Sequence, residues 1–218
     1  STGIFIFTKS KTGTISDNTI TSGKDKGIAI NSVKCKMTIS GNTIKKCKAY
    51  PIYCNPASTS YAITLKKNII TGNSKKIDGI RADSGKLILS SNTISSCSRA
   101  IILSSKVKGT VYPNTFKKNT YNNVKVNSSY VNTLTVKSLS GKSKSAKTAT
   151  LNWKKLSSAS GYVVYRSASK NGSYTKISTI KKNKTITYKD SKLKRKSTYY
   201  YKIVPYTTIG KTTVYGLD

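Results

Sequence analysis

Short runs of alternating apolar and polar residues recur through the first half of the chain, about once every two dozen residues. The most regular position is an asparagine with one apolar residue three positions before it and another two positions after it. The asparagines are Asn18, Asn42, Asn68, Asn92 and Asn114. Their apolar neighbours are Ile15, Ile39, Leu65, Leu89 and Val111 on one side and Ile20, Ile44, Ile70, Ile94 and Phe116 on the other. Period-two apolar positions between turn residues predict short β-strands that bury one face.

A second recurring run begins 8 to 11 residues after the asparagine. Its copies are Gly27–Ile30, Pro51–Cys54, Gly79–Ala82 and Ala100–Leu103, with an earlier one at Gly3–Ile6. Alternation points Ile28, Ile30 and their equivalents inward. The outward positions are then Phe5, Ala29, Tyr53, Arg81 and Ile102. Because no repeat can bury its apolar face alone, the repeats must stack, and residues 1–130 are predicted to form a solenoid of about five coils.

Stacked coils would place the five asparagines in one column, since neighbouring strands lie roughly 4.8 Å apart. Each amide would then donate a hydrogen bond to the next and satisfy groups at a tight interior turn. The alternative is ordinary turn chemistry, because asparagine tolerates left-handed backbone conformations. Both interpretations are structural, and neither makes the asparagines catalytic.

The Asn-x-Ile and Gly-Ile registers resemble those of the right-handed parallel β-helix family, the pectate-lyase-like solenoids, over about residues 1–125. The resemblance implies that Gly27–Ile30 is the first strand of a coil, Met37–Ser40 a second strand and Thr43–Cys47 a third. It also implies where chemistry would occur. Family members that cleave acidic polysaccharide do so on the outer face of the first-strand sheet, with clustered Asp holding calcium and a Lys or Arg as the base.

On that face the candidate catalytic residues are Asp78, Arg81 and Asp83. Calcium requires six to eight oxygen ligands, and one or two carboxylates supply few of them. A turn at Asp78 and an exposed ion pair between Arg81 and Asp83 explain the same residues without catalysis. Phe5 and Tyr53 are candidate platforms on which a sugar ring stacks. No metal or cofactor is predicted, and calcium would be needed only by a lyase.

The amino-acid composition excludes several classes of catalytic and metal-binding site. The chain has 218 residues, with 40 Lys and Arg against six acidic residues, all Asp, and it has no His. The absence of His excludes Ser-His-Asp and Cys-His nucleophile systems and His-ligated zinc. The net charge of +34 is spread over both halves and comes mainly from Lys. It predicts a solvated surface, or a salt-sensitive affinity for polyanions, rather than a specific nucleic-acid site.

Four cysteines follow the same repeat. Cys47 and Cys97 share a register two coils apart, roughly 9–10 Å, which exceeds the ~7 Å limit for the Cα atoms of a disulfide. Cys54 takes an inward strand position, and Cys35 falls in a variable loop. Three pairings are arithmetically possible, but none is favoured by this spacing, so free thiols that pack as small apolar residues are expected.

After residue 130 the repeat stops, and residues 131–218 contain seven short alternating runs separated by turn signals. The first run is Leu134–Leu139, followed by a polar segment, 140–148, that is expected to be a flexible turn. Seven short runs at this close spacing predict an antiparallel β-sandwich. Leu151-Asn152-Trp153, the run 161–167 and Leu193 with Tyr199 resemble a fibronectin type III domain over roughly residues 132–218. By that resemblance Trp153 packs between the sheets and Tyr199 makes the tyrosine corner. In the run Tyr199–Tyr201, strand alternation sends only Tyr200 outward, which makes it a candidate sugar platform.

A β-helix followed by a fibronectin-like module resembles the layout of large secreted or surface-attached bacterial proteins. We therefore expect an all-β, extracellular, non-catalytic scaffold or binding region of a larger protein, whose partner is cell-wall or extracellular polysaccharide, possibly anionic. The alternatives are a polysaccharide lyase or glycoside hydrolase and a general polyanion binder. No apolar run approaches the ~20 residues of a membrane span. The oligomeric state and the mode of anchoring stay open.

Overall fold

The computed structural model describes residues 3–6, 12–21, 23–31, 34–73 and 76–217. All regular elements in these ranges are β-strands. The search of the same ranges for a helix that is long and apolar enough to cross a membrane finds none. The chain divides into two compact units, one of residues 1–133 with 208–214 and one of residues 134–207 with 215–218.

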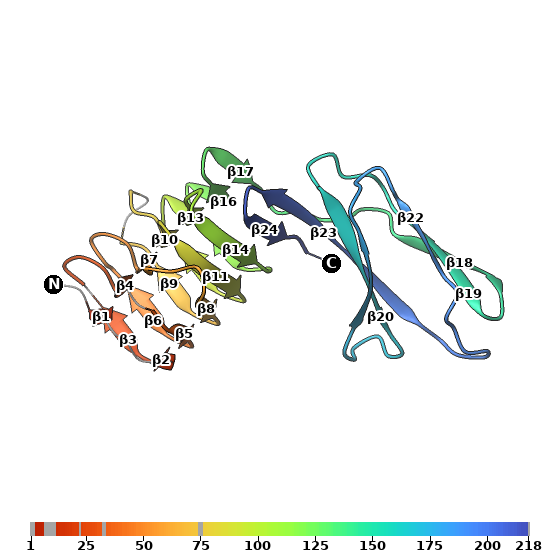
Figure 1. The fold of residues 1–218 in the computed structure, drawn as a ribbon, viewed down its shortest axis with the longest axis horizontal. Coiled ribbons are helices and arrows are strands. Elements are labelled where there is room, and N and C mark those ends of the chain that lie inside the picture. Colours follow the sequence, from red (N-terminus) through yellow and green to blue (C-terminus); the bar gives the residue numbers. More distant parts are fainter. Residues whose placement is uncertain (1–2, 7–11, 22, 32–33, 74–75, 218) are drawn as a thin grey trace. The chain divides into compact units, whose positions relative to one another are not determined.

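The first unit is a solenoid of three parallel sheets, whose strands lie as successive rungs in Figure 1. Sheet A contains β1 (Ile4–Ile6), β4 (Ile28–Asn31), β7 (Ile52–Asn55), β10 (Ile80–Ala82), β13 (Arg99–Leu103) and β16 (Tyr121–Val126). Sheet B contains β2 (Thr12–Ser16), β5 (Lys36–Ser40), β8 (Ala62–Lys66), β11 (Gly85–Ser90) and β14 (Val107–Val111). Sheet C contains β3 (Thr19–Thr21), β6 (Thr43–Lys45), β9 (Ile69–Thr71), β12 (Thr93–Ser95) and β15 (Thr115–Lys117).

Strand pairing places equivalent residues of successive coils directly beside one another. Ile28 pairs with Ile4 on one side and Ile52 on the other, and Ile80 pairs with Ile52 and Ile101. The inward residues of the middle coils are fully buried, and these columns form the core of the unit. The predicted parallel β-helix is thereby confirmed, with about five coils.

The asparagines form a hydrogen-bonded column at the turn between sheets B and C. Asn18, Asn42, Asn68 and Asn92 each donate from Nδ2 to Oδ1 of the asparagine in the next coil, at 2.9–3.0 Å, and the column ends at Asn114. The backbone N–H of each donor residue also bonds to that next Oδ1. Asn42, Asn68 and Asn92 are fully buried, so the column satisfies polar groups that have no access to water.

The left-handed residues of these turns are the ones before the asparagines. Asp17, Gly41, Lys67 and Ser91 have φ between 55° and 68°. A second left-handed position recurs after sheet C, where Lys46, Ser96 and Lys118 precede Cys47, Cys97 and Asn119. The residue that precedes each of these asparagines makes the backbone reversal. The asparagines therefore contribute through the hydrogen bonds of their side-chain amides.

Two strands end the stack after the last coil. In sheet A, β17 (Ser129–Val131) pairs antiparallel with β16. In sheet B, β24 (Thr212–Tyr215) returns from near the end of the chain and pairs with β14, through Thr110 with Thr213 and Val111 with Val214. The buried hydroxyl of Thr212 donates to Val107 O at 3.0 Å and accepts from Gly109 N–H at 3.2 Å. These strands cover sheet edges that would otherwise present unpaired backbone groups.

The second unit contains two antiparallel three-stranded sheets. One consists of β18 (Ser140–Ser145), β19 (Thr148–Asn152) and β22 (Thr187–Asp190), and the other of β20 (Gly161–Ser167), β21 (Thr175–Ile180) and most of β23 (Tyr200–Ile209). Leu151 and Trp153, from the first sheet and the residue that follows it, pack with Tyr162, Val164 and Ile203 of the second. The Trp153 and Tyr162 rings meet edge-on with centroids 5.3 Å apart.

Two predictions for this half are wrong. Residues 134–139 form no strand, and the polar segment expected to be a flexible turn contains β18, which pairs with β19 from Ser140 opposite Asn152. This segment forms a strand because it makes the backbone hydrogen bonds of a hairpin. Its residues alternate Ser and Lys and include few apolar side chains, so the sequence pattern did not indicate a strand. The run 212–215 is the strand β24, as expected; it lies beside β23 in the strand order, and it also pairs with β14 of the first unit, which the sequence did not predict.

All four cysteines are free and fully buried. Burial raises the pKa of the Cys54 and Cys97 thiols to about 12. Cys35 lies in the connection before β5, as expected, and is nevertheless fully buried there.

Candidate binding face on sheet A

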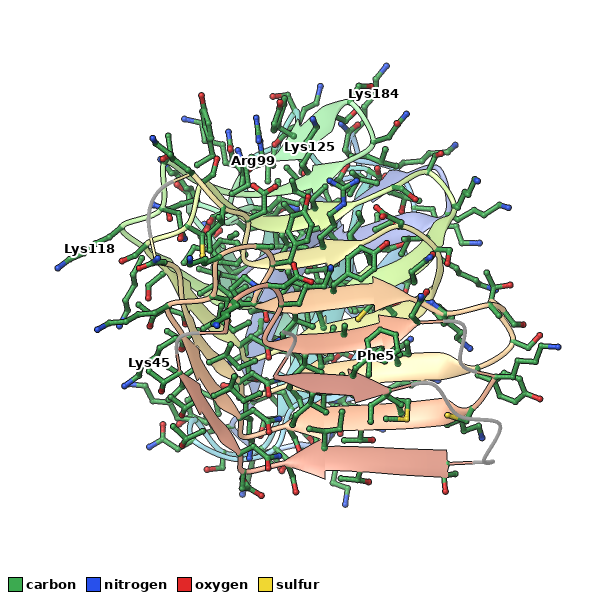
Figure 2. The ribbon with its side chains drawn as sticks, turned by 90° about the vertical axis from the view of Figure 1, so that its left-hand side faces the viewer. Phe5, Lys45, Arg99, Lys118, Lys125 and Lys184 are labelled. Atoms are coloured by element: carbon green, nitrogen blue, oxygen red, sulfur yellow. The ribbon has the colours of Figure 1, made fainter. Side chains whose placement is uncertain are left out.

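Strand register aligns one residue of each sheet A strand in a row on the outer face, in which Ala29 is the buried member at 1% exposure. The residues of the row lie side by side in the order Phe5, Ala29, Tyr53, Arg81, Ile102, Lys125 and Tyr130. Phe5 is 57% exposed at one end and Tyr130 is 53% exposed at the other. Phe5, Arg99 and Lys125 are labelled in Figure 2, where Lys45 and Lys118 project from the side formed by sheet C.

A linked cluster occupies the middle of the row. The Tyr53 hydroxyl donates to Asp83 Oδ2 at 2.9 Å, and Arg81 Nε donates to Asp83 Oδ1 at 3.0 Å. Arg81 Nη1 also donates to the Tyr50 hydroxyl at 3.1 Å, with its guanidinium 5.2 Å from the Tyr50 ring centroid. The Tyr50 and Tyr53 rings are stacked, with centroids 5.9 Å apart and planes 24° from parallel. Two rings, a guanidinium and a carboxylate are therefore held in one fixed arrangement.

The surroundings of Tyr53 keep its hydroxyl protonated. Burial, and then the hydrogen bond to Asp83, raise the pKa of Tyr53 to about 12. Tyr53 therefore stays a hydrogen-bond donor at physiological pH, and Asp83 accepts from both Tyr53 and Arg81. The carboxylate is already engaged by these two donors.

Cations over aromatic rings flank the cluster. Lys26 Nζ lies 5.4 Å from the Tyr53 ring centroid, and Lys125 Nζ lies 5.5 Å from that of Tyr130. Arg99 lies 5.3 Å from the centroid of Tyr121. Such contacts hold a positive charge over the face of a ring that stays partly exposed.

Asp78 is placed apart from the other two catalytic candidates. Its Oδ1 accepts from the backbone N–H of Arg99 at 3.2 Å and lies 3.9 Å from Arg99 Nη1. Burial raises the pKa of Asp78, although the Arg99 charge opposes the shift. Of the predicted site residues, the structure thus brings Arg81, Asp83 and Tyr53 together and pairs Asp78 with Arg99. Phe5 lies further along the row. Tyr200 lies in β23 of the second unit.

Sequence reasoning missed Tyr50, Arg99, Tyr121 and Lys125. A signal was present for two of them. The residue two positions before the first inward isoleucine of each coil is Lys26, Tyr50, Asp78 and then Arg99, a column of polar and aromatic residues in the same register as the strands. The register between β13 and β16 is irregular between the pairs Arg99–Tyr121 and Ile101–Val124, so the positions of Tyr121 and Lys125 within β16 did not repeat earlier ones.

Three parallel sheets wound into coils with buried columns define a parallel β-helix protein. The family model described as "Periplasmic copper-binding protein (NosD)" matches residues 1–149, more than half of the chain, and the chain belongs to this family. The periplasmic description agrees with the prediction of a protein outside the cytoplasm. No curated protein matches the chain. A solved Fn3-like protein from Clostridium thermocellum is 30% identical over 35% of this chain and 77% of its own, with a TM-score of 0.29.

Proposed function

We propose that this chain is a non-catalytic scaffold and binding region of a larger extracellular β-helix protein, and that the outer face of sheet A binds acidic polysaccharide. The observation that carries the proposal is the fixed cluster of Tyr50, Tyr53, Arg81 and Asp83. Stacked rings offer flat apolar surface to the C–H face of a sugar, while the surrounding cations attract its carboxylates. A row that runs along the solenoid suits an extended chain of sugars better than a single small molecule.

The carboxylates favour binding over cleavage. A lyase needs clustered carboxylates free to hold calcium, and a glycoside hydrolase needs two that act as acid and base. Here Asp83 is held by Arg81 and Tyr53, and Asp78 lies against Arg99. Within the described ranges there is no group of three or more His, Cys, Asp or Glu that could hold a metal ion. The cluster orients a ligand but offers no unengaged acid and base.

The copper named in the family description does not fit this chain. Copper sites in proteins are built from imidazole and sulfur ligands, and the chain has no His and one Met. The cysteine sulfurs are fully buried, and burial raises the pKa of two thiols to about 12, which opposes formation of the thiolate that a metal needs.

A titration with copper tests whether the chain lacks a copper site. Copper(II) added to the protein in a non-chelating buffer is expected to show no saturable site tighter than about 10 µM, because the required ligands are missing. Calorimetry is the measurement, with a histidine-containing copper protein as the positive control. One equivalent bound tightly would contradict the account.

We also infer that the second unit is a fibronectin type III-like sandwich that serves as a spacer. Trp153 packs between the two antiparallel sheets, as such a domain requires. The Tyr199 hydroxyl accepts from Lys194 N–H, five residues upstream, at 3.2 Å, in the manner of a tyrosine corner. An approximately rigid module of this kind holds a binding solenoid at a distance from its anchor.

The binding face is tested with the double variant Tyr53→Ala/Arg81→Gln. Affinity for de-esterified polygalacturonate, measured by affinity electrophoresis at fixed salt, is expected to fall by about ten-fold or more, since a ring platform and a charged donor are both lost. The matched control is Tyr61→Ala/Lys45→Gln, which removes an exposed ring and one charge away from sheet A. Its affinity should stay within about two-fold of the parent, because exposed single charges contribute little.

Equal losses in the two variants would mean that only net charge is recognised, and would favour the general polyanion binder. Binding of a neutral galactan as tightly as polygalacturonate would also contradict the proposal, because the cations of the face would then have no role.

A further inference from the structure

A pocket of about 430 Å³ opens in the second unit, remote in sequence from the sheet A row. It lies between the hairpin β18–β19 and the segment that joins β22 to β23, residues 191–199. Pockets of a few hundred Å³ are of a size that holds a small organic ligand. The volume corresponds to one or two sugar rings rather than to an inorganic ion.

The lining combines three kinds of side chain. Ala149, Leu151 and Leu193 are apolar, Ser143, Ser197 and Thr198 bring hydroxyls, and Lys142, Lys194 and Lys196 bring positive charge. Among the residues that the structure describes, no acidic side chain forms an ion pair with any of the three lysines, which favours an anionic ligand.

One wall of the pocket is held in place by a buried acid. Asp190, 3% exposed, accepts from Arg166 Nη1 and from the Tyr201 hydroxyl, each at 2.9 Å, and from Lys192 N–H at 3.1 Å. The Arg166 guanidinium in turn lies 5.1 Å from the ring centroid of Tyr199. Tyr199 and Tyr201 both line the pocket, so two of its aromatic walls are fixed before any ligand arrives.

The segment 191–199 is also tied to the hairpin by one hydrogen bond and braced internally by another. Leu193 N–H donates to Lys147 O at 3.3 Å, which ties the segment to the β18–β19 hairpin. Lys194 N–H donates to the Tyr199 hydroxyl at 3.2 Å. The backbone that carries Lys194 and Lys196 is thus positioned relative to the apolar floor, and less ordering is needed on binding.

From these observations we propose that this pocket is a second binding site, which takes an acidic saccharide unit of one or two rings. The apolar floor and the tyrosine rings accept the C–H face of the sugar, the hydroxyls pair with its hydroxyl groups, and the lysines pair with its carboxylate. The site does not depend on the solenoid face, because every residue that lines it belongs to the second unit.

The test uses digalacturonate as the probe, with the full chain carrying Tyr53→Ala/Arg81→Gln so that the sheet A face is disabled. Calorimetry at fixed ionic strength is expected to show saturable binding in this background. The triple change Lys142→Gln/Lys194→Gln/Lys196→Gln should weaken it by about ten-fold or more, since three charge-assisted contacts are lost. The charge-matched control, Lys176→Gln/Lys181→Gln/Lys184→Gln, should stay within about two-fold.

Retained binding in the face-disabled background supports a separate pocket whether or not the sheet A proposal holds. No saturable binding of digalacturonate, or equal weakening by the two triple variants, would overturn the pocket. Equal affinity for neutral digalactose, or displacement by an equal concentration of inorganic phosphate, would overturn its assignment to an acidic saccharide. Thermal unfolding of each variant, followed by Trp153 fluorescence, shows that the second unit stays folded.

Discussion

Replacement of Asn68 by alanine is expected to lower the free energy of unfolding of the first unit by about 4 kcal/mol. Asn68 is fully buried in the middle of the asparagine column. Its Oδ1 accepts from Asn42 N–H and from Asn42 Nδ2, and its Nδ2 donates to Ile39 O and to Asn92 Oδ1. Alanine would leave a backbone N–H and a carbonyl without partners inside the core, and each such group costs about 1–3 kcal/mol.

The control is Asn18→Ala, at the half-buried first position of the same column, where the expected loss is about 1 kcal/mol. Amide hydrogen exchange of peptides from β5, β8 and β11 measures the effect on the first unit. The single tryptophan, Trp153, packs in the core of the second unit, so its fluorescence reports that unit independently. Equal effects at the two positions would show that the column does not act through buried amide pairs.

The second large effect is expected for Val214→Asp in the strand that covers the last coil. Val214 is 5% exposed and pairs with Val111 of β14. An unpaired carboxylate at a buried site costs several kcal/mol, about 3–5 in comparable cases, so β24 should detach from β14. The freed edge of β14 then offers unpaired backbone groups to another molecule, and concentration-dependent association should follow.

Thr213→Asp is the matched control, because Thr213 lies between two buried residues of β24 and is itself only half-buried. Light scattering coupled to size-exclusion chromatography measures the mass of both variants. We expect association of the Val214 variant and an unchanged mass for the Thr213 variant. An unchanged mass and unchanged stability for Val214→Asp would mean that β24 does not protect the end of the solenoid.

The solenoid was predictable because its information repeats. Inward apolar residues and an asparagine recur at equivalent positions of successive coils, so several copies of the pattern predict the same strand register. The covering strand was not predictable in this way. Thr212 bonds to Val107 and Gly109, more than 100 residues earlier. Within the described part of the chain this contact does not recur in other coils, so no sequence periodicity predicts it. The strand β18 was missed because hydrogen bonding with β19, and not an apolar pattern, determines it.

The sheet A face was predictable in part. Alternation alone identified Phe5, Tyr53 and Arg81 as outward, since side-chain direction in a strand follows position. The partners of the cluster were harder to predict. Tyr50 precedes β7 and contacts Arg81 of the neighbouring strand β10, so its contact depends on the turn conformation rather than on strand geometry. The pocket of the second unit also lay outside the sequence argument, because a loop and a hairpin far apart in the chain create it.

We propose that this protein binds acidic polysaccharide without cleaving it. The most direct measurement incubates the unaltered protein with polygalacturonate and calcium, and follows retention of the protein and absorbance of unsaturated uronate in the same sample. The account predicts retention that saturates with polysaccharide concentration and an absorbance that stays at the level of the protein-free control. A steady rise in absorbance that is lost in Arg81→Ala would contradict it and establish a lyase, and an absence of retention would contradict it equally.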